Sequence, residues 1–450
     1  MNPATFKTGA DARVARLFVA VAASLIVMVT AYVAITTFAA GPVASAEAEN
    51  GTISAGADQM QDGSASQSSA LLFGRVSAPV TNPSAEPLPP ADVDHREYMH
   101  GVEFVKTGGR HLLLYASNQY PPVSPAGEWE HDIFYSEINP ADPNGSFSPK
   151  PLVSAVTAQE PASGAVNSNG KLLVTSEDAQ FSPDLDQTYG IWDGNLAPLV
   201  PYGAKLMPPQ GGHSGHAAAS GDKFLVSFSD GWVDGGGVDN LGTGDDIFGK
   251  IVNDDGTAGQ IINTAVGTDN RDWWPIVAGS DTGWLQVWQR YGTAGTGGGT
   301  VMGALIDHSG AIVKELPIYD NNKYYYYDVQ YVPSLGAYLV VGSQNTGSNE
   351  GVAVLVSKSG TIIASKTGLP STVRESQTVV SDDGKTAVYT VPGTGVAVLD
   401  LTSSAITLRK EVPIDWNWDY MGTDGIFVGG GRVLFATGTQ AGIRFITAQL

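Results

Sequence analysis

The segment GVAVL occurs twice in this sequence, in GVAVLVS at Gly351–Ser357 and in GVAVLDL at Gly395–Leu401. A very apolar segment precedes each copy, AYLVVGS at Ala337–Ser343 and KTAVYTV at Lys385–Val391. Short runs rich in Val, Leu, Tyr and Thr that follow a glycine turn are typical of β-strands. The repeated unit is therefore a glycine turn, a buried strand, a loop and another strand.

The same unit recurs along the chain from residue 97 to the end. The apolar second strands are expected at Arg110–Ser117, Lys171–Ser176, Lys223–Ser229, Trp284–Gln289, Ala337–Ser343, Lys385–Val391 and Arg432–Gly438. The turns that lead into them hold Gly109, Gly170, Gly221, Gly283, Gly336, Gly384 and Gly430. Short strands in groups of four, at a period of about 40–60 residues, predict stacked radial sheets. We therefore expect an all-β fold, a seven-bladed β-propeller over residues 95–450; a β-sandwich pair or a solenoid is the alternative.

The seventh unit ends at Leu450, directly after its third strand, and would leave an open sheet edge. The apolar island Leu71–Ser77 is a candidate to close the ring beside Gly442–Ala448. It lies in an otherwise low-complexity stretch, residues 47–94, which is rich in Gly, Ser, Ala, Gln and Pro and typical of a disordered linker.

Residues 1–46 have the composition of a targeting segment. Lys7, Arg13 and Arg16 precede the uncharged run Leu17–Ala40, which at 1.5 Å per residue is long enough to cross a bilayer. The cationic flank predicts that the remaining chain lies outside the cytoplasm, at the cell surface or secreted. Ala44–Ala46 offers a small-residue cleavage site. A cleaved signal peptide and a retained membrane anchor therefore both remain open.

Composition excludes several classes of function. Acidic residues outnumber basic ones by 45 to 24, giving a net charge of −21, so a phosphate backbone would be repelled and nucleic acid is not an expected partner. The chain has no cysteine, which excludes disulfides, thiolate metal sites and cysteine nucleophiles. The sequence also lacks a phosphate-binding glycine loop that leads into a helix, and a serine nucleophile elbow.

Polar and aromatic residues gather just before the expected first strands, which line the central channel of a propeller. The candidate ligand-binding residues are Arg96, Glu97, His213, His216, Arg271, Trp273, Trp274, Tyr327, Asp328, Arg374, Glu375, Trp418 and Asp419. Carboxylates and guanidinium groups hydrogen-bond to hydroxyls, and aromatic faces stack on sugar rings. The pattern favours a carbohydrate or cell-envelope polymer as the ligand; side chains that only pack or pair between blades are the alternative.

Two of the carboxylates are candidates for the paired acid and base of glycoside hydrolysis. Asp272 follows Arg271, a cation that would keep it ionised, so it is the candidate nucleophile or base. Glu160 has no charged neighbour in sequence and is the candidate proton donor. We further expect Glu97, Glu160, Asp272, Asp328, Glu375 and Asp419 to converge on one face around the propeller axis.

Three stretches resemble glycoside-cleaving propellers. HREYMHGVEFVKTGGRHLLLYAS, at residues 95–117, resembles the first blade of sialidase-type glycosidases. NRDWWPIVAGSDTGWLQVW, at residues 270–288, is similar to the Arg-Asp-Pro inner strands of arabinan- and fructan-cleaving propellers, with Trp-Trp interposed. SDDGKT, at residues 381–386, resembles an Asp-box hairpin without its following aromatic. The sialidase resemblance would imply a carboxylate clamp of Arg96, Arg271 and Arg374 and a nucleophile among Tyr324–Tyr327, although sialidases have six blades.

Metal binding has less support. The Asp- and Gly-rich loop at residues 230–246 is a candidate Ca²⁺ site by oxygen ligation, and His213 with His216 form a candidate transition-metal pair. The functional prediction is an extracytoplasmic, glycan-directed propeller, with glycoside hydrolysis as its enzymatic form. The alternative is a non-catalytic surface module that binds a protein partner or serves as an envelope scaffold.

Overall fold

The computed structural model describes residues 57–61, 69–73, 101–118, 131–155, 158–179, 185–206, 212–230, 246–267, 270–292, 298–347, 350–393, 395–414, 416, 418, 422–439 and 442–450. The chain divides into two compact units, Met1–Thr81 and Asn82–Leu450. In the first unit, β1 (Ala57–Gln61) pairs antiparallel with β2 (Ser69–Phe73). The apolar run at residues 17–40 lies outside the described residues, among which no helix is long and apolar enough to span a bilayer.

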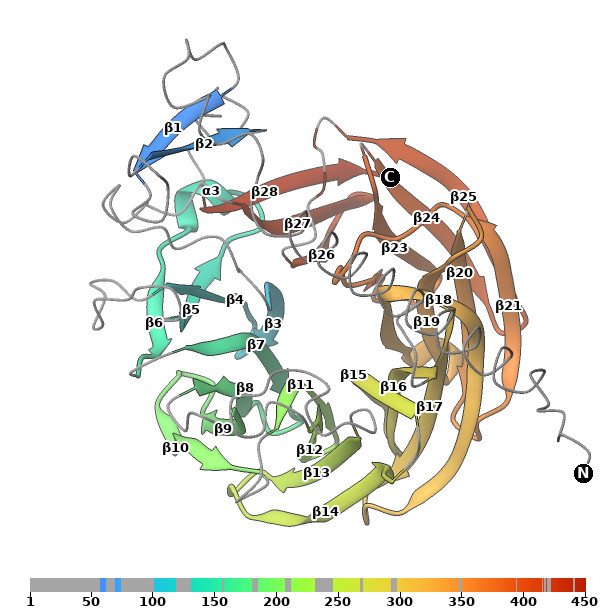
Figure 1. Ribbon diagram of the computed structural model, residues 1–450, viewed down its shortest axis with the longest axis horizontal. Coiled ribbons are helices and arrows are strands. Elements are labelled where there is room, and N and C mark those ends of the chain that lie inside the picture. The colour runs from blue at the N-terminus through green and yellow to red at the C-terminus, as the bar shows by residue number, and fades with distance from the viewer. Residues whose placement is uncertain are drawn as a thin grey trace, which may run out of the picture. The chain divides into compact units, whose positions relative to one another are not determined.

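The second unit is built almost wholly of antiparallel sheets, in agreement with the all-β prediction (Figure 1). The first sheet holds β3 (Glu103–Thr107), β4 (Arg110–Asn118), β5 (His131–Ile138) and β6 (Lys150–Val153), with the short helix α3 (Pro143–Ser146) before β6. The second holds β7 (Gln159–Val166), β8 (Leu172–Asp178), β9 (Asp186–Trp192) and β10 (Pro198–Lys205). The third holds β11 (His213–Ser220), β12 (Lys223–Ser229), β13 (Ile247–Asn253) and β14 (Ala258–Ala265).

The C-terminal half contains the longest strand of the chain. A seven-stranded sheet holds β15 (Asn270–Gly279), β16 (Gly283–Gly292), β17 (Gly299–Asp307), β18 (Ile312–Val332), β19 (Ala337–Gln344), β20 (Gly351–Ser357) and β21 (Ile362–Leu369), with the 3₁₀ turn η3 (Pro333–Leu335) after β18. The last two sheets hold β22 (Val379–Val380), β23 (Thr386–Val391), β24 (Gly395–Thr402) and β25 (Ala405–Pro413), and then β26 (Thr423–Gly429), β27 (Arg432–Thr439) and β28 (Gly442–Gln449).

Strand β18 serves two neighbouring sheets. Its first half, from Ile312 to Asn322, pairs with β17, and its second half, from Asn322 to Val332, pairs with β19. One continuous strand is therefore the outer edge of one four-stranded unit and the inner edge of the next.

The sheets of this unit stand around a central opening with their first strands innermost (Figure 1). Each expected second strand is observed as a strand, and all these strands are almost completely buried. They read as continuous apolar runs because neighbouring sheets cover both of their faces. The core lies in layers between sheets; one layer joins β19 and β20 to β23 and β24 through Leu339, Leu355, Tyr389 and Leu399.

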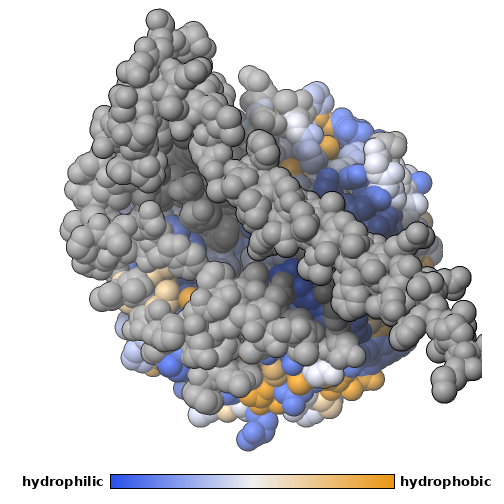
Figure 2. Space-filling model, viewed as in Figure 1, coloured by the Kyte–Doolittle hydropathy of each residue, from blue (hydrophilic) through white to orange (hydrophobic). Residues whose placement is uncertain are grey.

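The outermost strands face solvent instead. Figure 2 shows mixed hydrophilic and hydrophobic residues on the visible rim, with orange residues along its lower edge. Among the described residues, the exposed large apolar side chains are Leu199, Val266, Val313 and Ile362, which lie on or directly after β10, β14, β18 and β21.

The first and last sheets of the unit contact each other at a seam. Val102, Leu113 and Tyr115 share an apolar cluster with Leu434 and Ile443. Among the described residues the last sheet has three strands. Of the proposed closing strand, Leu71–Phe73 pairs within the β1–β2 hairpin and residues 74–77 lie outside the described residues. Pairing of this segment with Gly442–Ala448 therefore stays a prediction.

Candidate functional site

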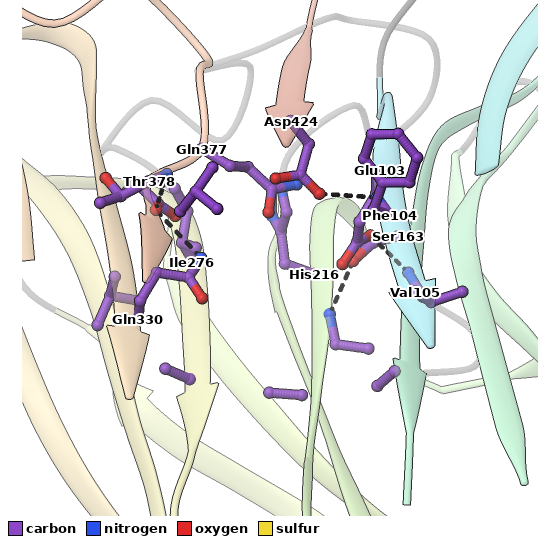
Figure 3. A pocket seen from close by; sticks show the side chains of 18 of the residues that line it. Glu103, Phe104, Val105, Ser163, His216, Ile276, Gln330, Gln377, Thr378 and Asp424 are labelled. Atoms are coloured by element: carbon purple, nitrogen blue, oxygen red, sulfur yellow. Dashed lines mark hydrogen bonds between the residues drawn. The ribbon is translucent and has the colours of Figure 1, made fainter. Parts of the chain in front are cut away.

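A channel of about 760 Å³ runs through the centre of the propeller unit. Its wall is made by the inner strands, which contribute residues from 101–106, 161–166, 216–219, 274–279, 327–331, 375–382 and 422–427. Figure 3 shows how polar side chains from these strands, including Glu103, Gln330 and Asp424, reach into it. The channel is thus a hollow with a polar wall, which is a suitable place for a hydrophilic ligand.

The inner strands share an unusual backbone at one end of this channel. Four non-glycine residues have positive φ there, Ser214 at 56°, Trp274 at 55°, Tyr325 at 66° and Glu375 at 55°. In β11, β15 and β18 the strand register shifts at this point, which is the mark of a β-bulge. A left-handed non-glycine residue costs about 1–2 kcal/mol, and such strain concentrates at functional sites. The bulges define one mouth of the channel, which we call the bulged mouth.

Aromatic rings that are almost completely buried pack into a continuous wall at the bulged mouth. Trp273 Nε1 donates a hydrogen bond of 2.6 Å to the Tyr325 hydroxyl, and Tyr324 donates one of 3.1 Å to the same oxygen. Trp274 meets the Tyr325 ring edge-on at 4.7 Å between centroids. The His213 ring lies 4.5 Å from that of Trp273. The wall therefore combines aromatic faces with imidazole and hydroxyl groups from three consecutive inner strands.

Two arginines stack on this aromatic wall. The Arg271 guanidinium carbon lies 4.2 Å from the Trp273 ring centre, and that of Arg374 lies 4.4 Å from the Tyr325 ring centre. Arg374 also donates a hydrogen bond of 2.9 Å to Glu375. Cation–π attraction of this kind stabilises the guanidinium groups next to the rings. Their position provides donors next to the aromatic faces.

A cluster of carboxyl groups lies next to His213 of the aromatic wall. Glu160 of β7 lies directly opposite Glu177 of β8, and Glu160 Oε2 contacts His131 Nδ1. Glu177 Oε1 accepts a hydrogen bond from the backbone of Ser214. Burial raises the pKa of Glu177 to about 8, and the charge of Glu160 adds to the rise. Burial also lowers the pKa of His213 to about 3, so the imidazole is neutral and Glu177 is protonated at pH 7.

Asp272 is held in a buried ion pair behind the bulged mouth. Arg290 Nε lies 2.7 Å from Asp272 Oδ1, and Arg290 Nη2 lies 3.1 Å from Oδ2. Trp288 Nε1 donates another hydrogen bond of 2.7 Å to Oδ1, and Asp272 has no exposed surface. The cation that faces Asp272 is thus Arg290 on the neighbouring strand, and its sequence neighbour Arg271 lies on the aromatic wall.

Three carboxyls in the channel wall connect neighbouring inner strands. Glu103, Asp328 and Asp424 each accept a hydrogen bond from a backbone N–H of the adjacent sheet. The donors are Gly164, Thr378 and Phe104 respectively, each at 2.7 Å. Burial raises the pKa of Glu103 to about 8 and that of Asp424 to about 7. The bond from Phe104 to Asp424 also crosses the seam between the first and last sheets.

The structure brings most of the sequence-predicted site residues to the bulged mouth. His216, Trp274, Tyr327, Asp328 and Glu375 line the channel. Glu160, His213, Arg271, Trp273 and Arg374 belong to the adjoining wall and carboxyl cluster described above. Trp418 is buried, where it packs edge-on against Phe435 and donates a hydrogen bond of 2.7 Å to the Gly395 carbonyl. Arg96, Glu97 and Asp419 lie outside the described residues, so the convergence of the six carboxylates remains a prediction.

Tyr325 lies within the run Tyr324–Tyr327 that the sialidase resemblance implied. Three residues of the site were not predicted from the sequence, namely His131, Glu177 and Arg290. Each was overlooked because it reaches the mouth through cross-strand pairing or a bulge. The candidate Ca²⁺ loop lies outside the described residues from 231 to 245. Elsewhere in the described part of the chain, no three acidic or histidine side chains are grouped so that they could hold a metal ion.

No protein-family model and no curated protein sequence matches this chain. Similar solved structures include the GH93 α-L-arabinofuranosidase of Fusarium graminearum with arabinobiose, at 12% identity and a TM-score of 0.44 over 81% of this chain and 96% of that one. Hadza microbial sialidase Hz136 is 11% identical, with a TM-score of 0.42 over 79% and 66% of the two chains. U3-55K is 12% identical, with a TM-score of 0.47 over 80% and 100%. These structures thus include an arabinofuranosidase and a sialidase, the kinds of glycosidase that the sequence resembles. Their sequence identity to this chain is too low to imply a shared activity.

Proposed function

We propose that this protein is an extracytoplasmic propeller that binds a carbohydrate at its bulged mouth. The observation that carries the proposal is the continuous wall of Trp273, Trp274 and Tyr325 with Arg271 and Arg374 stacked on it. A sugar ring offers apolar C–H faces and a rim of hydroxyls. Trp274, which lines the channel, and the guanidinium donors of Arg271 and Arg374 beside it match these features, and the channel of about 760 Å³ leaves room for the ligand.

The proposed location rests on the N-terminal sequence. Lys7, Arg13 and Arg16 before the apolar run Leu17–Ala40 support export of the remaining chain, either cleaved after the small-residue site or anchored in the membrane. A cell-surface or secreted position would expose the bulged mouth to envelope polymers.

The proposed architecture has seven blades. The division of β18 between two sheets supports counting the seven-stranded sheet as two blades. The lining of the channel by segments of seven inner strands supports the same count.

Glycoside hydrolysis is the enzymatic form of the proposal. It needs two carboxyls that reach the substrate. Glu160 meets this condition best among the predicted pair, since its side chain is 10% exposed at the mouth. Both oxygens of Asp272 are bound to Arg290 and its side chain is fully buried, so we expect Asp272 to support the rim of the mouth from behind.

A non-catalytic scaffold is the second candidate, and a specific observation favours it. Charged groups at and behind the mouth are paired with each other, as in Asp272–Arg290 and Arg374–Glu375. Such pairs would stabilise a binding surface for a protein partner without any chemistry.

Glycan binding by the full-length chain tests the proposal. On an array of plant and microbial glycans, we expect binding that weakens at least about tenfold in Arg374→Ala, because a charged hydrogen bond to the ligand contributes about 1.5–3 kcal/mol. Arg409→Ala is the matched control, since Arg409 is similarly exposed and paired with Asp400 on the outer strands. Absence of any glycan binding, together with capture of a protein partner, would favour the scaffold.

A further inference from the structure

Glu160 and Glu177 form a side-by-side carboxyl pair. They are directly opposite in the antiparallel pairing of β7 with β8, at the point where the register of these strands shifts. Opposite residues of such a pair project from the same face of the sheet, with Cβ atoms about 4.5–5.5 Å apart. Their side chains are 10% and 15% exposed, so both carboxyls are largely buried and keep a small accessible surface.

The surroundings of the pair differ for its two members. Glu160 contacts the imidazole of His131 from β5. Glu177 accepts from the backbone N–H of Ser214, and its Oε1 lies 4.0 Å from His213 Nδ1 on β11. Among the described residues, Arg271 on β15 is a further charged group near the pair, and it faces His213. One carboxyl thus has a basic partner and the other is placed against a neutral imidazole and a backbone donor.

We propose that Glu177 is the proton donor and Glu160 the negatively charged partner of an acid–base pair that cleaves a glycosidic bond at the bulged mouth. This inference rests on the proposed carbohydrate binding and adds a catalytic residue to it. The raised pKa of Glu177, about 8, agrees with a carboxyl that carries its proton at neutral pH.

The proposed reaction balances with water as the only co-reactant. Glu177 gives its proton to the glycosidic oxygen as the bond from that oxygen to the anomeric carbon breaks, so the leaving sugar departs as an alcohol. Side chains that project from directly opposite residues of one sheet face suit the retaining course, in which Glu160 bonds to the anomeric carbon. Glu177, now ionised, then takes a proton from water as the water oxygen displaces Glu160, and both carboxyls return to their starting state.

The acid role of Glu177 is tested by the leaving group. Phenyl and 2,4-dinitrophenyl glycosides of α-L-arabinofuranose, β-D-galactose and β-D-glucose are assayed with the full-length chain. Glu177→Gln should reduce kcat/KM for the phenyl glycoside by about 10²–10⁴-fold. It should leave the dinitrophenyl glycoside nearly unaffected, because that leaving group needs no proton. The parent activity should fall as pH rises through about 8, and the variant should lack this fall.

The role of Glu160 is tested by chemical rescue. Glu160→Ala should lose activity on both glycosides, and added azide should restore turnover with a glycosyl azide as product. Azide then replaces the missing carboxylate as the nucleophile that expels the aryl alcohol.

Glu137→Gln is the matched control, since Glu137 is 55% exposed and pairs with Arg110 on the outer side of its sheet. Its activity should equal that of the parent. Equal loss on both leaving groups in Glu177→Gln would show a structural role and overturn the inference, and so would hydrolysis of none of the glycosides by the parent. Glycan binding is measured on the same protein. Binding without hydrolysis would overturn only this inference, and absence of any glycan binding would contradict the proposed function itself.

Discussion

The bulge residues decide which side chains meet at the mouth. Counting back from the turn at Gly170, regular pairing would place Asp178 opposite Glu160, and the shift in register places Glu177 there. In β15 the same shift brings Arg290 opposite Asp272 in place of Tyr291. One extra residue in the inner strand therefore changes both carboxyl environments.

At this scale the first prediction concerns Asp272. Asp272→Asn should lower the free energy of unfolding by about 2–4 kcal/mol, because it leaves the Arg290 guanidinium without its charged partner in a buried site. Denaturant unfolding checks this. Asp400→Asn, which breaks an exposed pair with Arg409, should cost less than about 1 kcal/mol. Equal stability of the two variants would contradict the structural role of Asp272.

The second prediction concerns the close approach of backbones at Gly101. This residue has a φ of 67°, and a Cβ there would lie 2.1 Å from the Ala162 carbonyl oxygen. Gly109 has a φ of 78° with open space around it. Gly109→Ala should therefore cost only the strain of positive φ, about 1 kcal/mol, and Gly101→Ala clearly more. Similar unfolding midpoints for both would show that the two inner strands are not packed this closely.

Buried carboxyls connect the inner strands, and their ionisation makes the stability of the fold depend on pH. Glu103 and Asp424 have pKa values of about 8 and 7 in the folded chain, above their ordinary values, so the folded state binds more protons than the unfolded state. The pKa of Glu177 is also raised, so its ionisation affects the stability in the same direction. The stability from these groups is complete below about pH 4 and is lost as pH rises to about 8. His213, whose pKa is lowered, has the opposite effect below about pH 6.5.

We therefore expect the melting temperature to fall between pH 6.5 and pH 8.5, the range in which these buried carboxyls lose their protons. Glu103→Gln should make this fall shallower, because the amide can still accept from Gly164 and does not ionise. Thermal unfolding followed by circular dichroism across this range measures the effect. A melting temperature that rises with pH would contradict the assignment of protonated carboxyls in the channel wall.

Much of the strand pattern followed from the sequence alone. A glycine turn and an apolar run predicted the second strand of each repeat. These strands are apolar along their whole length because neighbouring sheets bury both of their faces. The continuity of two repeats through β18 was not predicted, because the repeat pattern places the last strand of one unit and the first strand of the next as separate strands. The candidate site was predicted by position at strand starts. Its pairs were not, because they depend on bulges that composition does not reveal.

Contacts between the first and last sheets close the propeller unit at its seam. Phe104 donates to Asp424, and an apolar cluster that includes Val102, Leu113 and Leu434 joins the first and last sheets. The last sheet has only three strands among the described residues, which leaves its edge for a further segment.

If Leu71–Ser77 covers that edge, a chain that starts at residue 85 should lose marked stability relative to one that starts at residue 65. The expected cause is the loss of strand pairing beside Gly442–Ala448. Differential scanning calorimetry of both chains makes the comparison. Equal transition temperatures would rule out this segment as the closing strand.

Calorimetric titration of the full-length chain with the glycan selected on the array tests most directly whether the bulged mouth binds a carbohydrate. We predict saturable binding to the parent, loss of at least about tenfold in affinity for Trp274→Ala, and unchanged affinity for Arg409→Ala. Binding that is equally strong in Trp274→Ala, or no binding of any glycan to the parent, would contradict this prediction.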